Sequence, residues 1–275
     1  MRYHLLALDL DGTLLDDDKT ISACNQDAIR AAKDLGVMVT LSTGRMYRSA
    51  IRFANELKIE LPLITYNGAL IKDRAGSVHR ELLLPLESAH TVLAVAREYD
   101  LHVNVFIADD LFVDRNDVWT KRYYQTSRIP PRIVSNLQSV LTAAPNAMAL
   151  LGSKEKLRLV RTILAEKLID KAHVTTSDPH FVEIIHPNAS KQSGLAYLLR
   201  ELGFKTERVI AIGDNYNDLD MINYAGLGVA MANAPEEVRA QADYVTGNNN
   251  NGGVAHVINK FILAHGKKLS QSQEW

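Results

Sequence analysis

The sequence predicts an α/β protein with a Rossmann-like parallel sheet, helices on both faces of that sheet, and an inserted α+β domain. Three observations support this prediction. Apolar runs alternate with helical periodicity at the start of the chain, the same alternation returns near its end, and hairpin patterns lie between them. Strands that are apolar throughout are typical of parallel sheets covered on both faces.

Both outer parts of the chain alternate strands with helices. Ser22 is a candidate N-cap and Gly36 a candidate C′ residue of the first helix. In the first part we expect strands at 3–9, 37–42 and 61–66, helices at 22–35 and 46–57, and a turn-rich loop at 12–20. In the last part we expect helices at 190–202, 218–225, 235–242 and 254–264, and strands at 209–212, 227–231 and near Val245.

The middle segment has a different pattern. Strand–turn–strand signals at 103–113, around Asp109 and Asp110, and at 173–185 predict antiparallel hairpins, and 154–168 predicts a helix. The charge-free stretch 136–153 indicates a helix, a turn at Pro145 and a strand. We therefore expect two domains: a discontinuous core of residues 1–82 and 188–275, and an inserted domain of residues 83–187.

Composition disfavours several classes of function. The chain has 31 Lys and Arg against 32 Asp and Glu, a formal net charge of −1, so it lacks the cationic excess that favours nucleic acid or anionic lipid as a partner. Its one cysteine, Cys24, excludes an internal disulfide and multi-cysteine metal sites and fits the cytoplasm. We expect no membrane span and no export signal. The sequence shows no coiled-coil seam, so it gives no indication of the oligomeric state.

The strongest functional signal is the run DLDGT at residues 9–13, directly after the first predicted strand. Open α/β sheets bind their ligands at the carboxyl ends of strands. Asp9 and Asp11 are two residues apart, so on an extended chain their carboxylates lie on the same side and require a counter-charge. Among oxygen ligands, Mg²⁺ is the natural divalent ion. An Asx turn that caps the strand explains one of the two aspartates equally well.

A second acidic group favours the metal interpretation. Another apolar strand, 209–212, is followed by Gly213 and Asp214, and Asp218 comes four residues later. If the two strands are neighbours in the sheet, these carboxylates meet that of Asp9. The spacing does not match an EF-hand loop. N-capping by Asn215 or Asn217 is an alternative role that can coexist with metal binding.

Two weaker signals concern anions. Thr43 and Gly44 follow a strand and precede a helix, where free backbone N–H groups and a hydroxyl form a site for a phosphoryl group. An ordinary N-cap is the commoner explanation of such residues. Lys191 lies in the first turn of the helix after the inserted domain, where its charge opposes the helix dipole and indicates an anionic partner. A solvated surface lysine is the alternative.

In this order, the motifs resemble those of the haloacid dehalogenase superfamily of phosphohydrolases, and the likeness covers essentially the whole chain. Its four motifs correspond to DLDGT, the strand that ends in hydroxyls, Lys191, and GDNYND at 213–218. STGR at 42–45, YNGA at 66–69 and AMANA at 230–234 resemble the Cof-type branch. The resemblance implies a catalytic core whose inserted α/β cap selects the substrate.

The resemblance also implies a mechanism. Asp9 is the expected nucleophile, which forms an aspartyl-phosphate, and Asp11 is the expected general acid and base, so Asp9 should be ionised while Asp11 is protonated. Mg²⁺ is expected on Asp9, the Asp11 backbone carbonyl and Asp214, with Asp218 either behind these ligands or as an occasional ligand. The expected phosphate-binding residues are Leu10, Thr43, Gly44, Lys191 and Asn217, and the expected substrate contacts are Arg45, Asn67 and Gly68.

The expected function is Mg²⁺-dependent hydrolysis of small phosphomonoesters, such as sugar phosphates or phosphorylated cofactors. A phosphomutase that uses the same aspartyl-phosphate and a non-catalytic protein that binds phosphorylated metabolites remain alternatives. In the inserted domain, residues 121–124 and Arg128 combine cations with aromatic rings suited to a sugar phosphate, but a solvated amphipathic helix explains them more simply. His180 and His186 show no metal-binding spacing.

Overall fold

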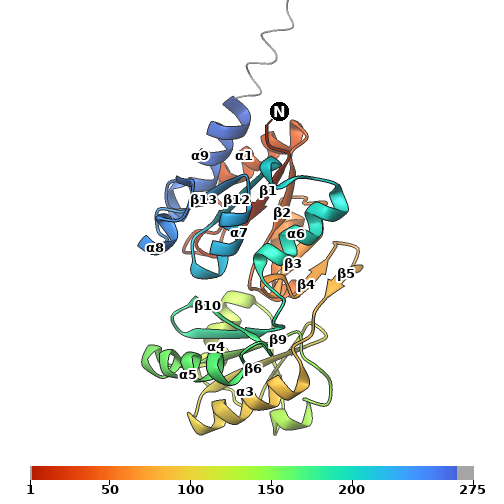
Figure 1. Ribbon diagram of the computed structural model, residues 1–275, viewed down its shortest axis with the longest axis vertical. Helices are drawn as coiled ribbons and strands as arrows, with labels where there is room; N and C mark the ends of the chain where they lie inside the picture. Colours follow the sequence, from red (N-terminus) through yellow and green to blue (C-terminus); the bar gives the residue numbers. More distant parts are fainter. Residues whose placement is uncertain (1, 265–275) are drawn as a thin grey trace, which may run out of the picture.

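The core domain is organised around a parallel sheet (Figure 1). The computed structural model describes residues 2–264. The order of the strands in this sheet is β2-β1-β12-β13-β14, and every pairing between neighbours is parallel, as the apolar runs predict. These strands are β1 (Leu5–Leu8), β2 (Met38–Leu41), β12 (Val209–Gly213), β13 (Leu227–Ala230) and β14 (Tyr244–Val245).

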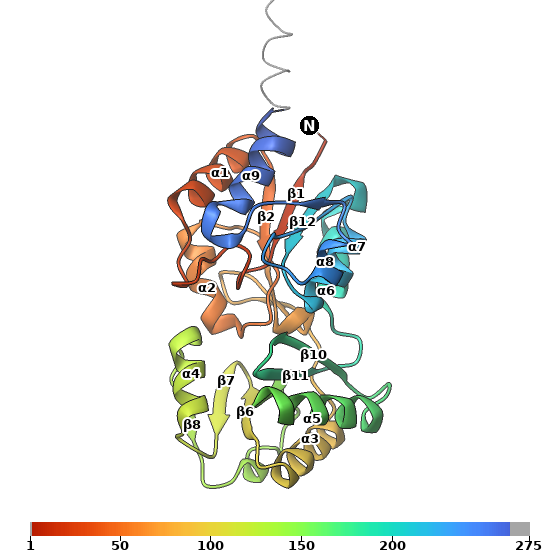
Figure 2. The same ribbon diagram turned by 90° about the vertical axis from the view of Figure 1, so that its left-hand side faces the viewer.

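Helices cover both faces of this sheet (Figure 2). Leu6 and Leu8 of β1 belong to the apolar cluster that includes α1 (Ala23–Asp34) and α9 (Gly253–Ile258). Leu5 and Ala7 belong to the cluster that includes α6 (Lys191–Leu202) and α7 (Leu219–Tyr224). The other α-helices described in the core are α2 (Tyr47–Glu56) and α8 (Glu236–Arg239), and a π-helical extension (Asn259–Leu263) follows α9. Short 3-10 helices lie at Tyr66–Gly68, Thr206–Arg208, Tyr216–Asp218 and Asn249–Asn251. No helix among residues 2–264 is long and apolar enough to cross a membrane.

A second, antiparallel sheet of the core departs from the sequence prediction. Residues expected to extend the parallel sheet form β3 (Leu63–Thr65), which pairs antiparallel with β4 (Leu70–Lys72), and β4 pairs with β5 (Val78–Glu81). An isolated parallel bridge joins Ser42 to Ile64, so β3 also runs beside the end of β2 in the expected direction. The chain reverses because three consecutive residues have positive φ, and these are Tyr66, Asn67 and Gly68.

The cap contains a mixed sheet of order β10-β11-β9-β6-β7-β8. Its helices α3 (Leu86–Glu98) and α5 (Lys154–Lys167) lie on the side away from the core (Figure 1). The third cap helix is α4 (Val118–Ser127). The strands are β6 (His102–Ile107), β7 (Asp110–Val113), β8 (Arg132–Ile133), β9 (Ala147–Leu151), β10 (His173–Asp178) and β11 (Phe181–Ile185).

Both predicted hairpins are present in the cap, as the antiparallel pairs β6–β7 and β10–β11. The helix predicted in the stretch 136–153 is wrong, because this segment forms a single 3-10 turn, Leu137–Ser139, before β9. Pro145 disfavours helical geometry in the residue before it, and the stretch that precedes it is too short for a stable helix.

The two connections between core and cap lie side by side. At the first, Leu82 donates its N–H to the carbonyl of Ala69 at 2.7 Å. At the second, the carbonyl oxygen of Ser190 lies against Gly68, and a Cβ at this glycine would be 2.0 Å from that oxygen. The consecutive core residues Gly68 and Ala69 therefore contact one connection each.

Candidate active site

The carboxyl edge of the parallel sheet brings three aspartates together. Because β1 pairs with β12 in parallel, Asp9 and Asp214 follow neighbouring strands at the same edge, as expected from the sequence. One carboxylate oxygen from each of Asp9, Asp214 and Asp218 lies within 4.8 Å of the others. Asp9 and Asp218 are buried.

Two glycines make room for this acidic cluster. A Cβ at Gly12, where φ is +80°, would lie 2.3 Å from Oδ2 of Asp214, and a Cβ at Gly213 would lie 2.4 Å from the side chain of Asp218. Oδ2 of Asp218 accepts a hydrogen bond of 3.1 Å from the backbone N–H of Asp214. Close packing therefore holds the carboxylates together, which is a reason for glycine in both motifs.

Lys191 is the cation of the cluster. Its Nζ lies 2.6 Å from Oδ1 of Asp9 and 2.5 Å from Oδ1 of Asp218, and its side chain is 1% exposed. Burial disfavours the charged lysine, but the two carboxylates outweigh burial and raise the pKa of Lys191 above its usual value. The anionic partner expected from its place in the first turn of α6 is therefore this pair.

The cluster fits a divalent cation. Burial raises the pKa of Asp9 to about 7 against the opposing effect of Lys191, and burial together with Asp9 raises the pKa of Asp214 well above its ordinary value. Three carboxylates facing one ammonium group leave an excess of negative charge, and their oxygens are the ligands that suit Mg²⁺. A bound cation would favour the ionised form of Asp9.

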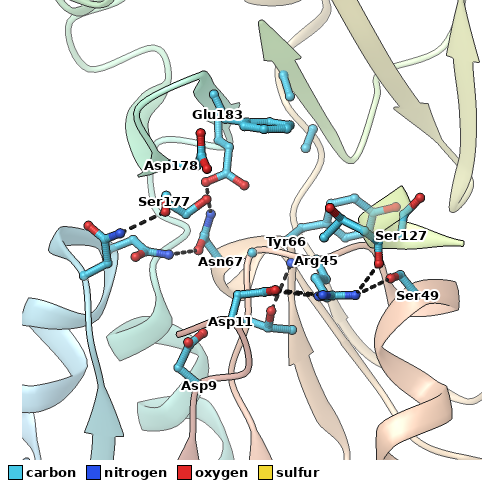
Figure 3. Close-up of a pocket in the computed structure, with 18 of the residues that line it drawn as sticks. Asp9, Asp11, Arg45, Ser49, Tyr66, Asn67, Ser127, Ser177, Asp178 and Glu183 are labelled. Atoms are coloured by element: carbon cyan, nitrogen blue, oxygen red, sulfur yellow. Dashed lines mark hydrogen bonds and ion pairs between the residues drawn. The ribbon is translucent and has the colours of Figure 1, made fainter. Parts of the chain in front are cut away.

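The carboxylate of Asp11 is bound to Arg45 (Figure 3). The Nε–Oδ2 distance is 2.6 Å, the Nη2–Oδ1 distance is 2.7 Å, and Nζ of Lys19 lies 3.1 Å from Oδ1. Burial favours the protonated form, but the two cations outweigh it and lower the pKa of Asp11 to about 2. The order of the two pKa values is therefore the reverse of the expected one, with Asp11 ionised and Asp9 raised.

Arg45, an expected substrate contact, lines the cavity but uses its donors within the protein. Besides binding Asp11, its Nη1 donates to the hydroxyl of Ser49 at 3.1 Å and to the carbonyl of Thr126 at 2.9 Å. Thr126 belongs to α4 of the cap, so this guanidinium links the general-acid candidate to the cap.

The N-terminus of α2 does not offer the free N–H groups that we expected there. The first two, those of Tyr47 and Arg48, donate to the carboxylate of Asp109, a residue of the cap. These two amides are therefore not available to a ligand, whereas the anion site expected at Thr43 and Gly44 lies in the loop before the helix and stays a prediction.

Thr43 and Gly44 nevertheless line the cavity between the domains. The Thr43 hydroxyl accepts a hydrogen bond of 3.1 Å from the N–H of Arg45 and keeps its own proton for another acceptor. A Cβ at Gly44 would lie 2.9 Å from Oε1 of Glu183 in β11, so the absence of a side chain lets the cap approach this loop.

A chain of polar side chains crosses from core to cap (Figure 3). Nδ2 of Asn217 donates to Oδ1 of Asn67 at 2.9 Å, and Nδ2 of Asn67 donates to Oε2 of Glu183 at 3.3 Å. Oδ1 of Asn217 is buried and has no protein partner. Both asparagines and Glu183 line the cavity, so a ligand bound there would contact this chain of side chains.

A cavity of about 390 Å³ lies between the acidic cluster and the cap. Phe106, Tyr123 and Phe181 form an aromatic wall on the cap side, with successive ring centroids 5.8 Å and 6.2 Å apart. Arg122 also lines the cavity and pairs with Asp178 at 3.3 Å. Of residues 121–124, Arg122 and Tyr123 line this cavity, so the simpler interpretation of the segment as a solvated helix does not account for them.

Three expected site residues lie outside the cavity wall. The side chain of Leu10 is fully buried in the core, so its backbone is the part that can meet a phosphoryl group. Gly68 packs against the backbone of Ser190. Lys191 reaches the site through its contact with Asp9.

These features define a class of protein. A parallel α/β core gathers acidic side chains and a buried lysine at the carboxyl edge of its sheet, and an inserted cap encloses a cavity above them. This edge is where enzymes with open α/β sheets bind and convert small ligands.

Comparisons with known proteins identify the family. A family model for haloacid dehalogenase-like hydrolases matches residues 6–258. The 5-amino-6-(5-phospho-D-ribitylamino)uracil phosphatase YitU of Bacillus subtilis is 32% identical, and the match covers 94% of this chain and 97% of YitU. A haloacid dehalogenase-like hydrolase from Bacteroides thetaiotaomicron, with a solved crystal structure, is 32% identical with a TM-score of 0.86, covering 94% of this chain and 100% of that one.

The chain belongs to the haloacid dehalogenase-like hydrolase family. Within it, the chain is a phosphatase. Its fold is shared with a sugar phosphatase of subclass IIB, with a TM-score of 0.83 at 23% identity over 94% of this chain and 98% of that one. This confirms the resemblance on which the expected mechanism rests, and the family's use of a divalent metal agrees with the chemistry of the aspartate cluster.

Proposed function

We propose that the protein is a Mg²⁺-dependent phosphatase that hydrolyses small phosphomonoesters through an aspartyl-phosphate on Asp9. The position of Asp9 carries this proposal: its carboxylate lies at the cavity, contacts Lys191 and clusters with Asp214 and Asp218. A protein that merely binds a phosphorylated metabolite would gain nothing from clustered buried carboxylates, whose negative charges repel the ligand.

Asp9, Asp214 and the backbone carbonyl of Asp11 would hold Mg²⁺, with Asp218 as a further ligand. The bound ion would supply the positive charge that lets a phosphoryl dianion approach these carboxylates. Thr43, Gly44 and Asn217 would hold the phosphoryl oxygens. Lys191 keeps Asp9 oriented and compensates part of its charge.

In the first step, a carboxylate oxygen of Asp9 forms a bond to phosphorus while the bond to the leaving oxygen breaks. Asp11 gives that oxygen its proton, so the leaving group departs as an alcohol. In the second step, Asp11 accepts a proton from water as the water oxygen attacks phosphorus. The bond from phosphorus to Asp9 breaks, and inorganic phosphate is released. Since Asp11 must first carry a proton, we assign its ion pair with Arg45 to the resting enzyme.

The cavity favours an uncharged, hydroxylated leaving group. The cations that line it among the described residues are paired: Lys19 and Arg45 with Asp11, and Arg122 with Asp178. A second anionic group on the substrate would therefore find no free counter-charge.

Other groups of the cavity suit a hydroxylated substrate. The Glu183 carboxylate offers acceptors for hydroxyl groups, and the aromatic wall offers contact to the apolar face of a sugar or a flat ring. The substrate in the name of the relative YitU, a phosphorylated ribityl chain on uracil, has both features. This chemistry supports sugar-like phosphates or phosphorylated cofactors as substrates.

Turnover of 4-nitrophenyl phosphate tests the proposed function. We expect Mg²⁺-dependent release of inorganic phosphate that a chelator abolishes, and a loss of at least about 10⁴-fold in Asp9→Asn, because the nucleophile is removed. Asp27→Asn, an exposed aspartate of α1, is the control and should retain activity. Undiminished turnover in Asp9→Asn would contradict the proposal. An isomerised sugar phosphate formed without inorganic phosphate would indicate the phosphomutase instead.

A further inference from the structure

Helix α2 lacks an N-cap of its own. Its N-cap residue, Met46, has no side chain that can accept a hydrogen bond, and its first turn contains no acidic residue. The N–H groups of Ser49 and Ala50 both donate to the Met46 carbonyl at 3.1 Å. The two that remain without an acceptor in the helix are those of Tyr47 and Arg48.

The carboxylate of Asp109 satisfies both of these N–H groups. Oδ1 accepts from Tyr47 at 3.0 Å, and Oδ2 accepts from Arg48 at 3.0 Å. The hydroxyl of Tyr66 adds a third hydrogen bond, of 2.7 Å, to Oδ1. Asp109 is 6% exposed, so these bonds are shielded from water. The Asp109 side chain therefore acts as the N-cap of α2, although it is 62 residues from Tyr47 in sequence.

Asp109 reaches α2 from the opposite domain. It lies in the turn between β6 and β7, where Ala108 and Asp109 both have positive φ, and its own N–H donates to Oδ1 of Asn146 at 3.1 Å. In Figure 2, α2 belongs to the core and β7 to the cap, on opposite sides of the domain boundary. The capping interaction therefore exists when the cap is closed on the core.

The residues that Asp109 binds continue directly into the two loops of the site. Helix α2 follows residues 42–45, and Tyr66 begins the reversal at residues 66–68. These loops are also bound to each other, because Tyr66 donates its N–H to the carbonyl of Arg45 and Asn67 donates to that of Thr43, both at 3.0 Å. One cap carboxylate thus contacts the bases of both loops.

We propose that Asp109 is a positioning residue that couples closure of the cap to the arrangement of the phosphoryl-binding loops. By supplying the N-cap that α2 lacks, it holds residues 42–45 and 66–68 in the arrangement of the closed enzyme. Opening of the cap withdraws this carboxylate and exposes the Tyr47 and Arg48 amides. The effect on turnover rests on the proposed function, whereas the effect on these two amides does not.

Asp110 provides a matched control. It also reaches from the cap to α2, but through exposed ion pairs, at 2.5 Å with Arg48 and at 2.7 Å with Arg132. Exposed ion pairs contribute little to stability. Asp110→Ala therefore removes a negative charge from the neighbouring position in the same interface. It leaves the hydrogen bonds from Tyr47 and Arg48 to Asp109 intact.

Amide hydrogen exchange on the full chain, measured by NMR, tests the coupling directly. In the wild type we expect slow exchange at Tyr47 and Arg48, slowed further by Mg²⁺ with orthovanadate. In Asp109→Ala both amides should exchange about tenfold faster or more, the effect of losing a helix N-cap, with or without vanadate. Asp110→Ala should match the wild type, and Ala7 and Ile212 in the core sheet should be unchanged. Wild-type protection of both amides in Asp109→Ala would overturn the proposal.

Steady-state kinetics with 4-nitrophenyl phosphate separate positioning from simple stabilisation. We expect Asp109→Ala to lower kcat/KM about tenfold, mainly by raising KM, because the loops that bind the phosphoryl group are released. A merely structural role would lower Tm and leave KM unchanged, which contradicts the proposal. Asp109→Asn keeps one carbonyl acceptor and should fold if Asp109→Ala does not. Its KM should lie between those of Asp109→Ala and the wild type. Absent turnover in the wild type would count against the proposed function, and exchange would still decide the role of Asp109.

Discussion

The core and the cap place their cavity-facing groups in different ways. In the core, these groups follow the ends of parallel strands: Asp9 after β1, Thr43 after β2 and Asp214 after β12. In the cap they belong to the elements themselves, as Glu183 does in β11 and Tyr123 in α4. Topology alone therefore brings the core groups together, whereas strand register and helix rotation decide which cap groups meet the ligand. We expect substitutions in the core to remove the chemistry and those in the cap to change selectivity.

The largest of the remaining effects is expected from Lys191→Met in the core. The substitution leaves Asp9 and Asp218 buried without their ammonium partner, which should cost about 3–5 kcal/mol in the free energy of unfolding. Turnover of 4-nitrophenyl phosphate should fall about 10²- to 10³-fold because preorganised positive charge is lost. Circular dichroism and steady-state kinetics check both effects. Lys205→Met, an exposed lysine of the same domain, is the control, and equal activity in the two variants would remove Lys191 from the site.

A smaller and more selective effect is expected from Glu183→Gln in the cap. Sorbitol 6-phosphate and 6-phosphogluconate differ by one carboxylate, and the wild type should prefer the uncharged sorbitol ester. Since the variant removes a negative charge from the cavity wall, this preference should shrink about tenfold, while turnover of 4-nitrophenyl phosphate stays within about threefold. The ratio of kcat/KM values measures the preference. Glu155→Gln at the exposed start of α5 is the control, and an unchanged ratio in Glu183→Gln would show that the cap selects by another group.

The smallest effect concerns pH and metal in the core. Folding raises the pKa of Asp9 from 3.8 to about 7, so its contribution to stability is fully present below pH 3.8 and is lost as the pH rises through 7. Asp11 behaves oppositely: its pKa of about 2 gives stability above pH 3.8 that is lost as the pH falls toward 2. With a chelator, Tm should therefore fall between pH 5 and pH 8.

Mg²⁺ should recover more of the melting temperature at pH 8 than at pH 5, since it favours the ionised form of Asp9. Differential scanning fluorimetry of the wild type and Asp9→Asn measures both pH profiles. The variant should show a flatter profile with chelator and a smaller response to Mg²⁺. The same slope in both proteins would mean that Asp9 is not the group that titrates.

Much of the core could be predicted from the sequence because its elements obey local rules. Apolar runs identify the parallel strands, and the pairing of β1 with β12 brings Asp9 to Asp214 as expected. Part of what could not be predicted there depends on contacts distant in sequence. The ion pair between Asp11 and Arg45 is one such contact. The antiparallel pairing of β3 with β4 is local, across the reversal at residues 66–68, and was missed because strand 61–66 was assigned to the parallel sheet.

The site residues of the cap could not be predicted either, because their roles depend on contacts that are distant in sequence. Asp109 was recognised as a turn residue, but its role depends on a helix terminus in the other domain. Glu183 was missed, although a lone carboxylate within the apolar strand FVEII was the available signal. Tyr123 was missed because the sequence does not show which side of α4 turns toward the cavity.

The side-by-side connections at Gly68 and Ala69 make the inserted domain an exchangeable module. Because both connections contact neighbouring core residues, a graft from a relative can be joined at one place, provided that its contacts with Arg45, Asn67 and α2 are kept. Chimeras built at this junction would inherit the catalytic half of one parent and the selectivity of the other. A donor that lacks an acidic residue in the turn corresponding to β6–β7 would leave α2 uncapped, so successful grafts should be those that bring this carboxylate with them.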